Sequence, residues 1–364
     1  MQSWLPSQFE TGLVSVIIPT YQRADLLGET IHAFCEQTYR PLEIIVVEDG
    51  ETRETRKLVE QLSKQNTSEL RVTYLGQKNS GACKARNHGA ENSNGEFLVF
   101  TDDDDLPSKD FVEERMRVAR REAADLVIGP WQRFQAFEEK FYLFPVKNRS
   151  LSFPPNELWR AFLNGTKQLL QSCLISRSLV AQVGPWEESL HKAQDLDYKA
   201  RIYSSAKSIG FSKRGTIFYR MHPQSISGQA TPEKTASIKK ALQTVIKVTN
   251  ERTDEASLTA SLADYCVYAS HRMLAYGDQQ SAGEFLRQAK QLDKDSIDRN
   301  LSKLEKLCLL SALRPLVAPL YHWRKRLSRR KGSATPSSQT EIVEALPLNR
   351  LDEQTQPREI KVSS

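Results

Sequence analysis

The sequence predicts an α/β fold, with an open parallel sheet, helices on both of its faces and a helical appendage after it. Short apolar runs alternate with segments of helical periodicity through the amino-terminal third. Successive strand-helix-strand units of this kind imply parallel strands with right-handed crossovers. Beyond about residue 232 the strand pattern stops and only helical periodicity continues.

The predicted elements follow one another at short intervals. Strands are expected at residues 14–18, 42–47, 71–75 and 97–101, and helices at residues 24–37, 52–64 and 81–91. The last of these strands is rich in aromatic and branched side chains, which is typical of a strand buried on both faces. Because the strands are parallel, their carboxyl ends should meet at the edge of the sheet where open α/β folds bind ligands.

Four consecutive aspartates, Asp102 to Asp105, directly follow the strand at residues 97–101. Adjacent carboxylates repel one another unless a cation lies among them, and oxygen ligands favour Mg²⁺ or Mn²⁺ over softer metals. A solvated acidic turn, or a helix start that favours negative charge, would explain the same run. The edge position should gather the aspartates with residues 19–23 and Asp49, which follow or end the first two strands.

Composition limits the remaining possibilities. A chain of 364 residues allows about two domains, and 39% hydrophobic residues are enough for a core. The formal charge of +6 is modest, and a basic cluster lies at residues 324–331. Five cysteines without a CxxC pair argue against a zinc site or a disulfide framework and indicate a reducing, cytoplasmic setting. No basic and apolar leader precedes the first strand, so no secretory signal is expected.

Four sequence runs carry a resemblance to a known family. The runs VSVIIPTYQR, LEIIVVEDGE, GACKARNHGA and GEFLVFTDDDD, in this order and spacing, resemble the amino-terminal half of glycosyltransferase family 2 enzymes with the GT-A fold. Each run alone is a weak signal, but together they are specific. The resemblance implies a GT-A, Rossmann-like sheet and an inverting transferase. Such an enzyme moves a sugar from a nucleotide diphosphate donor, typically a UDP-sugar, to an acceptor hydroxyl with Mn²⁺ or Mg²⁺.

Several residues are candidates for the nucleotide side of such a site. Pro19 and Tyr21 would offer backbone groups and a ring to the base. Arg23 could reach a phosphate through its planar fork, or be a solvated residue at a helix start. The resemblance sets Asp49 against the base, although the family usually has Asp-Asp-Gly-Ser where this chain has Glu-Asp-Gly-Glu. Arg86 would point at the nucleotide or brace the acidic run, with a surface salt bridge as the alternative.

Within the acidic run, Asp102 and Asp104 match the first and last positions of the family's DxD motif. The resemblance implies that Asp104 is a metal ligand and that Asp103 lies nearer the donor ribose. Asp105 could instead cap a helix expected from about residue 108. The segment FYRMHPQSIS resembles one that often adds a histidine to the metal or the diphosphate, and His222 has that place. A bound cation would stabilise the charge on the departing nucleotide.

The segment VGPWEESLHKAQDLDYKARI resembles the part of the family that carries the catalytic base just before a helix. The usual Glu-Asp pair is Gln194 and Asp195 in this chain. Asp195 would therefore take the proton from the attacking acceptor hydroxyl, with a helix N-cap as the alternative. Gln194 could hydrogen-bond an acceptor hydroxyl, or it could signal impaired chemistry. Trp186 could stack on an acceptor sugar or fill the core.

The rest of the chain gives weaker signals. Strands are expected at residues 126–129, 171–175 and 216–220, helices at 156–163, 236–250 and 258–276, and an irregular aromatic stretch at 131–155. Residues 268–296 resemble one tetratricopeptide-like helix pair. The expected domains are an amino-terminal extension (1–12), the GT-A domain (13–230), a helical appendage (231–330) and a disordered tail (331–364).

An apolar stretch at residues 307–323 leads into the basic cluster, but it is too short and too interrupted to predict a membrane span. Residues 307–331 could form an interfacial helix that rests on anionic lipid, so that the protein associates peripherally with a membrane. The alternative is that this helix packs against the rest of the protein. The expected acceptor is a glycan or a lipid-linked saccharide of cell-surface or polysaccharide synthesis. The expected place is the cytoplasm, at the inner face of the membrane if the helix binds lipid.

Three other classes of protein stay as alternatives. A non-catalytic nucleotide-sugar binding protein is favoured only by Gln194. A nucleotidyltransferase would share the α/β sheet and Mg²⁺, but residues 19–23 lack the glycine-rich loop typical of those enzymes. A nucleic-acid binder would use the basic cluster, but no aromatic platform accompanies it, so no nucleic-acid partner is expected.

Overall fold

The computed structural model describes residues 4–137, 140–144, 157–166, 168–222, 231–251 and 257–300. Within them, seven strands form the main sheet: β1 (Glu10–Thr20), β2 (Leu42–Asp49), β3 (Leu70–Gln77), β4 (Gly95–Phe100), β6 (Leu126–Ile128), β9 (Cys173–Ser176) and β10 (Ile209–Phe211). Their spatial order is β10-β6-β9-β4-β1-β2-β3. The apolar residues 307–323, the basic cluster and the tail lie outside the described residues.

The predicted parallel sheet is confirmed for the four amino-terminal strands. β1 pairs in parallel with both β2 and β4, and β2 pairs in parallel with β3. The strand expected at residues 171–175 differs, because Leu170–Ser172 form a short 3-10 helix, η2, and β9 begins after it. β9 runs antiparallel to β4 and β6, so the main sheet is mixed.

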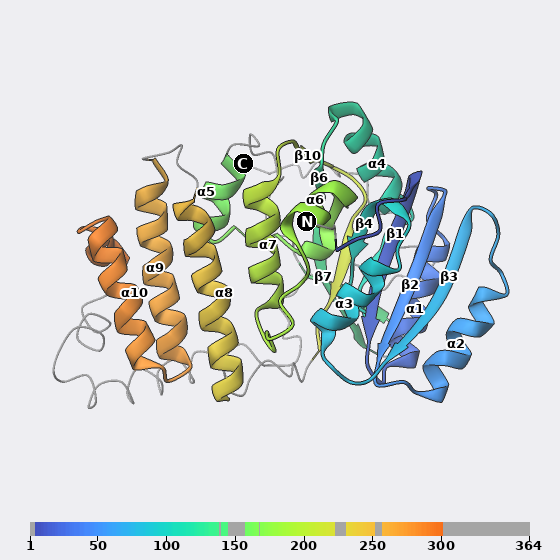
Figure 1. Cartoon of the computed structure of the whole chain (residues 1–364), viewed down its shortest axis with the longest axis horizontal. Helices are drawn as coiled ribbons and strands as arrows, with labels where there is room; N and C mark the ends of the chain where they lie inside the picture. Colours follow the sequence, from blue (N-terminus) through green and yellow to red (C-terminus); the bar gives the residue numbers. More distant parts are fainter. Residues whose placement is uncertain are drawn as a thin grey trace, which may run out of the picture.

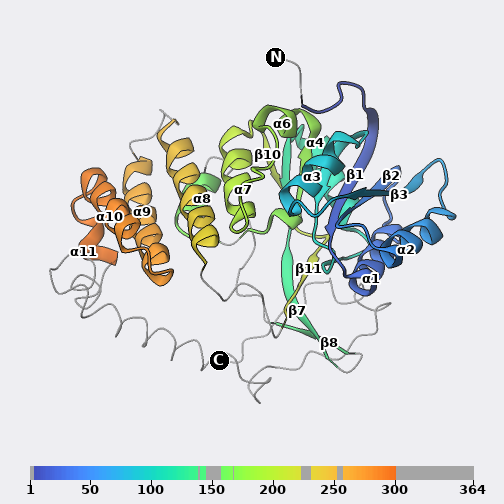
Figure 2. The same ribbon diagram turned by 60° about the horizontal axis from the view of Figure 1, so that its bottom comes forward.

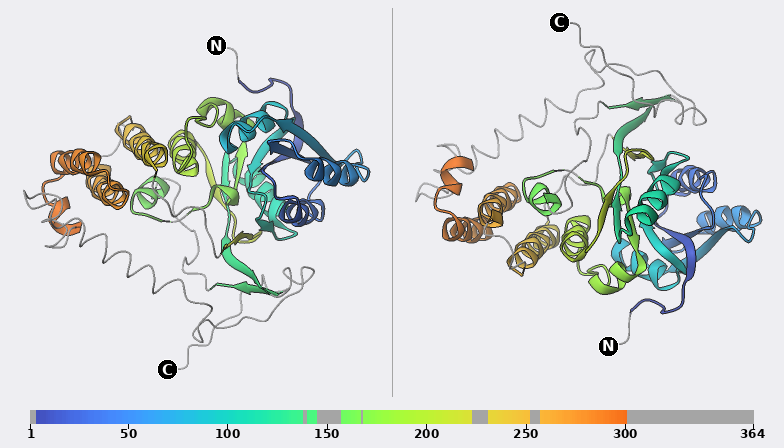
Figure 3. Two further views of the ribbon diagram at one scale, coloured as in Figure 1. Left: turned by 90° about the horizontal axis from the view of Figure 1, so that it is seen from below. Right: turned by 90° about the horizontal axis from the view of Figure 1, so that it is seen from above.

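Helices cover both faces of the main sheet, as predicted (Figure 3). Their bounds are α1 (Ala24–Cys35), α2 (Arg53–Ser63), α3 (Ala82–Glu91), α4 (Phe111–Glu122), α6 (Arg177–Val183) and α7 (Gln194–Ser205). Side chains alternate along a strand, so Val16 of β1 packs in a core with α1, α2 and α4, whereas Ile17 packs in a core with α3, α6 and α7. The two cores hold the sheet between two helical layers.

A second, smaller sheet projects from the main body beside the carboxyl edge of the main sheet (Figure 2). It contains β5 (Leu106–Pro107), β7 (Trp131–Phe137), β8 (Lys140–Leu143) and β11 (Ile217–Arg220), in the order β5-β11-β7-β8. The expectation of an irregular stretch from residue 131 is therefore wrong for β7 and β8. Their own small core forms around Phe134 and Phe141, whose ring centroids lie 5.4 Å apart.

The carboxyl-terminal described residues are helical, as predicted. They form α8 (Pro232–Asn250), α9 (Ser257–Ala275), α10 (Gln279–Leu292) and α11 (Ser296–Asn300). A short helix, α5 (Leu158–Leu163), lies earlier in the chain. Figure 1 shows α7, α8, α9 and α10 side by side in a row that extends from the sheet. Ile238 and Leu242 of α8 share one core with Tyr198 of α7, so the helical row is packed onto the α/β part. No helix among the described residues combines the length and the apolar character that crossing a membrane requires.

Candidate active site

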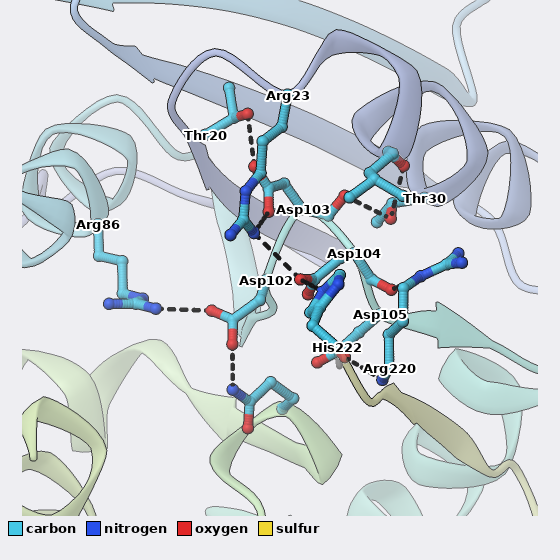
Figure 4. A network of polar contacts seen from close by, with 12 residues as sticks. Thr20, Arg23, Thr30, Arg86, Asp102, Asp103, Asp104, Asp105, Arg220 and His222 are labelled. Atoms are coloured by element: carbon cyan, nitrogen blue, oxygen red, sulfur yellow. Dashed lines mark hydrogen bonds and ion pairs between the residues drawn. The ribbon is translucent and has the colours of Figure 1, made fainter. Parts of the chain in front are cut away.

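The four aspartates at residues 102–105, which we call the acidic loop, lie at the carboxyl edge of the main sheet directly after β4. The neighbouring strand β1 ends at the same edge, and Thr20 and Arg23 from its end contact the acidic loop (Figure 4). Asp49 lies one strand further along, at the end of β2. The edge therefore gathers the residues that the strand order predicts.

Asp102 is held by two side chains from different parts of the chain. Arg86 Nη2 donates to Asp102 Oδ1 at 2.7 Å, and Gln171 Nε2 donates to Asp102 Oδ2 at 2.7 Å (Figure 4). Arg86 is only 6% exposed. Burial lowers the pKa of Arg86, but the charges of Asp102 and Asp195 raise it, and the net change is upward. Arg86 is thus a permanent cation that braces the acidic loop, which is one of the two roles expected for it.

Arg23 bridges the next two aspartates. Its Nη1 lies 3.2 Å from Asp103 Oδ1 and 3.1 Å from Asp104 Oδ2, while Thr20 donates to Asp103 Oδ2 at 2.7 Å. Burial raises the pKa of Asp103 to about 6, and the charge of Asp104 adds to this against the opposing effects of Thr20 and Arg23. The contacts of Arg23 favour a role in the site over that of a solvated residue.

Asp105 has a different environment from the one expected. It is fully buried, and its Oδ1 accepts from the backbone N–H of Arg220 at 3.2 Å. Burial, followed by the charges of Asp102 and Asp104, raises its pKa well above the ordinary value. The next helix, α4, begins only at Phe111, with Asp110 at its N-cap position, so the expectation that Asp105 caps it is wrong.

Asp104 and His222 are candidates for holding a metal. His222 Nε2 lies 2.7 Å from Asp104 Oδ2, so a carboxylate oxygen and an imidazole nitrogen converge on one place (Figure 4). In the described part of the chain, no group of three or more His, Cys, Asp or Glu side chains is arranged around a metal position. Mg²⁺ is commonly held by one or two carboxylates and the phosphates of a substrate. These two residues would fit a metal of that kind if phosphate oxygens of a substrate supplied the other ligands.

The Asp49 carboxylate accepts hydrogen bonds from groups of the protein itself. Its Oδ1 accepts from Gln77 Nε2 at 2.9 Å and from Ser80 N at 2.6 Å, and its Oδ2 accepts from Gly81 N at 2.8 Å. A carboxylate has about four acceptor positions, so one position is left for an N–H of a base. The contacts hold the loop before α3 against the end of β2.

The exposed ring of Tyr21 lies against Gly50, the residue that follows Asp49. The Tyr21 side chain is 47% exposed, and a Cβ at Gly50 would lie 2.9 Å from its Cε2, so only glycine allows the ring to lie there. Gly50 also has a φ of +127°, which disfavours other residues. Pro19 is buried in β1, where it lies in register with Val47 of β2.

Glu48, which stands where the family usually has aspartate, has a structural role. It is fully buried and accepts hydrogen bonds from the hydroxyls of Thr52 and Tyr74. These contacts join the end of β2 to the start of α2 and to β3. The longer side chain is therefore directed into the protein, away from Asp49.

Asp195 lies in the first turn of α7, close enough to Asp102 and Arg86 to interact with their charges. The N-cap residue of α7 is Ala193, in the left-handed conformation with a φ of 59°, so Asp195 is not the N-cap. Burial, followed by the negative charge of Asp102, raises the pKa of Asp195. The charges of Arg86 and Lys199 and a hydrogen bond from Gln171 oppose that rise. A carboxyl with a raised pKa near other catalytic candidates suits a general base.

Sequence reasoning missed Gln171 and Lys199. Gln171 is 3% exposed, its amide donates to Asp102, and its presence lowers the pKa of Asp195, so it lies beside both carboxylates. Lys199, one turn after Asp195, donates from Nζ to the carbonyl of Gln168 at 2.8 Å. Glutamine and lysine are common on surfaces, and their local sequence contains no motif that would have marked them.

Gln194 makes contacts within the protein at both ends of its amide. Its Oε1 accepts from Arg86 Nη1 at 3.2 Å, and its Nε2 donates to the carbonyl of Leu190 at 2.7 Å. An amide can make both contacts at once, whereas a glutamate would form an ion pair with Arg86 and could not donate to Leu190. The substitution is thus accommodated by the loop that precedes α7.

Trp186 packs in the core. It is 2% exposed, and its ring stacks on Tyr198 with centroids 4.1 Å apart and an interplanar angle of 6°. Phe100 of β4 contacts it edge-on, and the Arg86 guanidinium lies 4.6 Å from the ring centroid. Of the two roles expected for Trp186, this placement favours filling the core over stacking on an acceptor sugar. The ring supports Arg86 from below instead.

Comparison with known proteins assigns the amino-terminal part of the chain to a family. Residues 15–170 match the model of "Glycosyl transferase family 2". Over 129 residues the chain is 32% identical to Glycosyltransferase GlyA of Streptococcus pneumoniae serotype 4, covering 35% of this chain and 18% of that protein. It is 31% identical over 133 residues to Glycosyltransferase GlyG of the same organism, covering 36% and 43%. Residues 15–170 are therefore a glycosyltransferase family 2 domain.

Solved structures share the fold over more of the chain. The structure of S. aureus TarS 1–349 matches with a TM-score of 0.59 and 17% identity, covering 88% of this chain and 91% of that one. TarS 1–349 in complex with UDP-GlcNAc matches with a TM-score of 0.56, 20% identity and coverage of 88% and 92%. At this identity the likeness shows the fold, which is the predicted GT-A fold with carboxyl-terminal helices. The chain spans 18% and 43% of the two streptococcal relatives.

Proposed function

We propose that this protein is a metal-dependent, inverting glycosyltransferase that moves a sugar from a nucleotide diphosphate donor to an acceptor hydroxyl. One observation carries the proposal: Gln171 and Arg86 bring the acidic loop at the sheet edge together with Asp195, a carboxyl of raised pKa in the first turn of α7. A donor site that faces a general base is the arrangement that in-line displacement at a sugar carbon needs.

Each side chain has a role in the proposed reaction. Tyr21 and Asp49 bind the base, Asp103 lies near the ribose, and Arg23 pairs with the diphosphate. Asp195 accepts the proton from the acceptor hydroxyl as that oxygen attacks the sugar carbon opposite the nucleotide.

The acidic loop and His222, two residues after β11, would provide the metal site. Asp104 and His222 would hold Mn²⁺ or Mg²⁺, and Asp102 orients the acidic loop through Arg86. The bound ion would stabilise the negative charge that develops on the leaving nucleoside diphosphate. Two protein ligands leave several coordination positions for diphosphate oxygens and water.

The identity of the donor is proposed from two lines of support. The family resemblance favours UDP, and structures that share the fold, TarS 1–349, contain UDP or UDP-GlcNAc. We propose a UDP-sugar as donor, and a glycan or lipid-linked acceptor of cell-surface or polysaccharide synthesis. Peripheral contact with the inner face of the membrane through residues 307–331 would bring the enzyme to such acceptors.

The test is transfer by the purified protein with Mn²⁺ and a panel of UDP-sugars, measured as release of UDP with and without candidate acceptors. Release with one donor is expected. Asp195→Asn should lower kcat by about 10²- to 10⁴-fold, because the base is lost, and should leave donor affinity near the wild-type value. Binding of donors without any release would instead identify a nucleotide-sugar binding protein, and formation of UTP and sugar 1-phosphate when pyrophosphate is added would identify a nucleotidyltransferase.

A further inference from the structure

Helix α8 lies between the α/β part and the outer helices, directly beside α7 (Figure 1). It follows the family 2 match, which ends at residue 170. One of its faces contacts residues 187–197, the segment that leads into α7 and contains Asp195. We call this segment the base loop.

Two α8 side chains hold the beginning of the base loop. Lys240 Nζ lies 2.8 Å from Glu187 Oε2 and donates to Ser189 Oγ at 2.9 Å. Ser237 Oγ accepts from the backbone N–H of His191 at 3.0 Å. The contact of Ser237 with the N–H of His191 holds the backbone of the base loop, so it determines the path of the chain as well as the position of a side chain.

A third α8 side chain holds the end of the base loop. Thr244 Oγ1 donates to Asp197 Oδ1 at 2.7 Å. Asp197 is 3% exposed, and its Oδ2 accepts from Arg201 at 2.9 and 3.0 Å. Asp197 lies two residues after Asp195 in the first turn of α7, so this contact fixes the turn that carries the base.

The three α8 residues form one stripe along the helix. Ser237, Lys240 and Thr244 are spaced by three and four residues, which aligns them on one side of a helix. The helix is already anchored by apolar residues of the shared core, among them Ile238 and Leu242. The polar stripe is therefore additional to packing. Ser237 and Thr244 also donate to carbonyls of α8 itself, and the contacts of the stripe described above that reach outside the helix are to the base loop.

The opposite side of the base loop is held by α3. Asn87 Nδ2 donates to the carbonyl of Trp186 at 3.0 Å and to Glu188 at 3.0 Å, and Arg86 Nη1 donates to Gln194 at 3.2 Å. The base loop is thus fixed between the nucleotide-side helix α3 and α8. Loss of either support frees one side of the loop.

We infer that Ser237, Lys240 and Thr244 of α8 are positioning residues that hold the base loop so that Asp195 faces the donor site. The inference rests on the proposed function for its catalytic meaning. Small misplacement of a reacting group can lower a rate by about 100-fold, so fixing this loop acts on the chemical step. The helical appendage then contributes to catalysis, and loss of its contacts to the base loop should lower kcat.

The test compares two threonines of the same helix. Thr244→Val removes the hydroxyl that reaches Asp197, whereas Thr249→Val removes one that donates at 2.6 Å to the carbonyl of Val245 within α8. Thr244→Val should lower kcat about tenfold, the size expected for a hydrogen bond to a charged group, with the KM for donor unchanged. Hydrogen–deuterium exchange of the base loop should become faster in Thr244→Val and stay at the wild-type rate in Thr249→Val.

A second pair covers the beginning of the loop. Lys240→Met should speed exchange of the base loop and lower kcat. Lys247→Met, which changes an exposed lysine two turns further along α8 that pairs with Glu251, should do neither. Wild-type kcat and exchange in both Thr244→Val and Lys240→Met would overturn the inference. Absence of transfer by the wild-type enzyme would count against the proposed function instead, because the exchange experiment does not depend on turnover.

Discussion

Neighbouring side chains of one type differ in chemistry within the acidic loop. Asp102 is paired with Arg86, Asp103 is buried with a pKa of about 6, and Asp105 is enclosed with a pKa well above its ordinary value. Asp104 has His222 and Arg23 beside it. The four residues thus cannot exchange roles, although sequence alone presents them as a uniform run.

The raised pKa of Asp195 leads to a prediction about pH. A general base works in its ionised form, so the rate should fall as pH is lowered through a pKa above the ordinary value of about 4. Lys199→Met should move this acidic limb to higher pH, because the charge of Lys199 lowers the pKa of Asp195. The measurement is kcat/KM against pH.

Lys207→Met, which removes an exposed lysine after α7, is the matched control and should keep the wild-type profile. An unchanged limb in Lys199→Met would show that Lys199 does not act on the base.

The proposed metal site leads to a second prediction at this scale. Complete chelation should abolish sugar transfer, and added Mn²⁺ should restore it, because the leaving nucleotide then lacks its counter-charge. Asp104→Asn should need more Mn²⁺ for half-maximal rate, whereas Asp25→Asn, an exposed residue of α1, should not. The measurement is initial rate against metal concentration. Turnover that survives chelation would remove the metal from the mechanism.

At the scale of elements, α3 is pressed against the sheet through Gly89. A Cβ at this position would lie 2.6 Å from Ile17 Cγ2 and 3.1 Å from Val47 Cγ2. Both neighbours are fully buried strand residues, so they have little room to move. The close approach keeps Arg86, one turn earlier on α3, at the site.

Gly89→Ala should therefore lower the free energy of unfolding by about 1–3 kcal/mol and weaken donor binding, since α3 must move outward. The matched control is Gly28→Ala in α1, whose added Cβ meets only Leu58 at 3.7 and 3.9 Å. There the better helix propensity of alanine should raise stability by about 0.5–1 kcal/mol. Urea denaturation measures both; equal effects at the two glycines would contradict the packing argument.

The elements also show what sequence patterns can predict. β1 to β4 and α1 to α3 were predicted because apolar runs and helical periodicity reflect burial directly. β7 and β8 were missed because polar residues interrupt the sequence WQRFQAF, and the strands face a small separate core. The reversed direction of β9 was missed too, since strand direction depends on the pairing partner and leaves no mark in composition.

Strand order also explains which residues of the candidate site could be predicted from the sequence. Asp49, Arg86 and the acidic loop follow strands or begin helices, so their meeting at one edge follows from topology. Gln171 reaches Asp102 across 69 residues of chain, and Thr244 reaches Asp197 across 47. Contacts of this kind depend on how helices pack after the sheet has formed, which local pattern does not contain.

On the scale of the whole molecule, the packed core extends well beyond the residues that match the family 2 model. The match ends at residue 170, whereas Asp195, His222 and the stripe on α8 all follow it. One core extends from β4 through α7 to α8 and α9, so the helical row continues the α/β part. A fragment cut at the end of the match would lose part of the site together with most of this core.

The stacking of Trp186 beneath Arg86 has a consequence for ligand recognition. With an aromatic face below and Asp102 and Gln194 at its edge, the guanidinium has one orientation before anything binds. A flexible cationic side chain loses about 1.5–2 kcal/mol of rotamer entropy when it is immobilised. Folding has already imposed that loss on Arg86, so binding of an anion nearby requires no further ordering of this side chain.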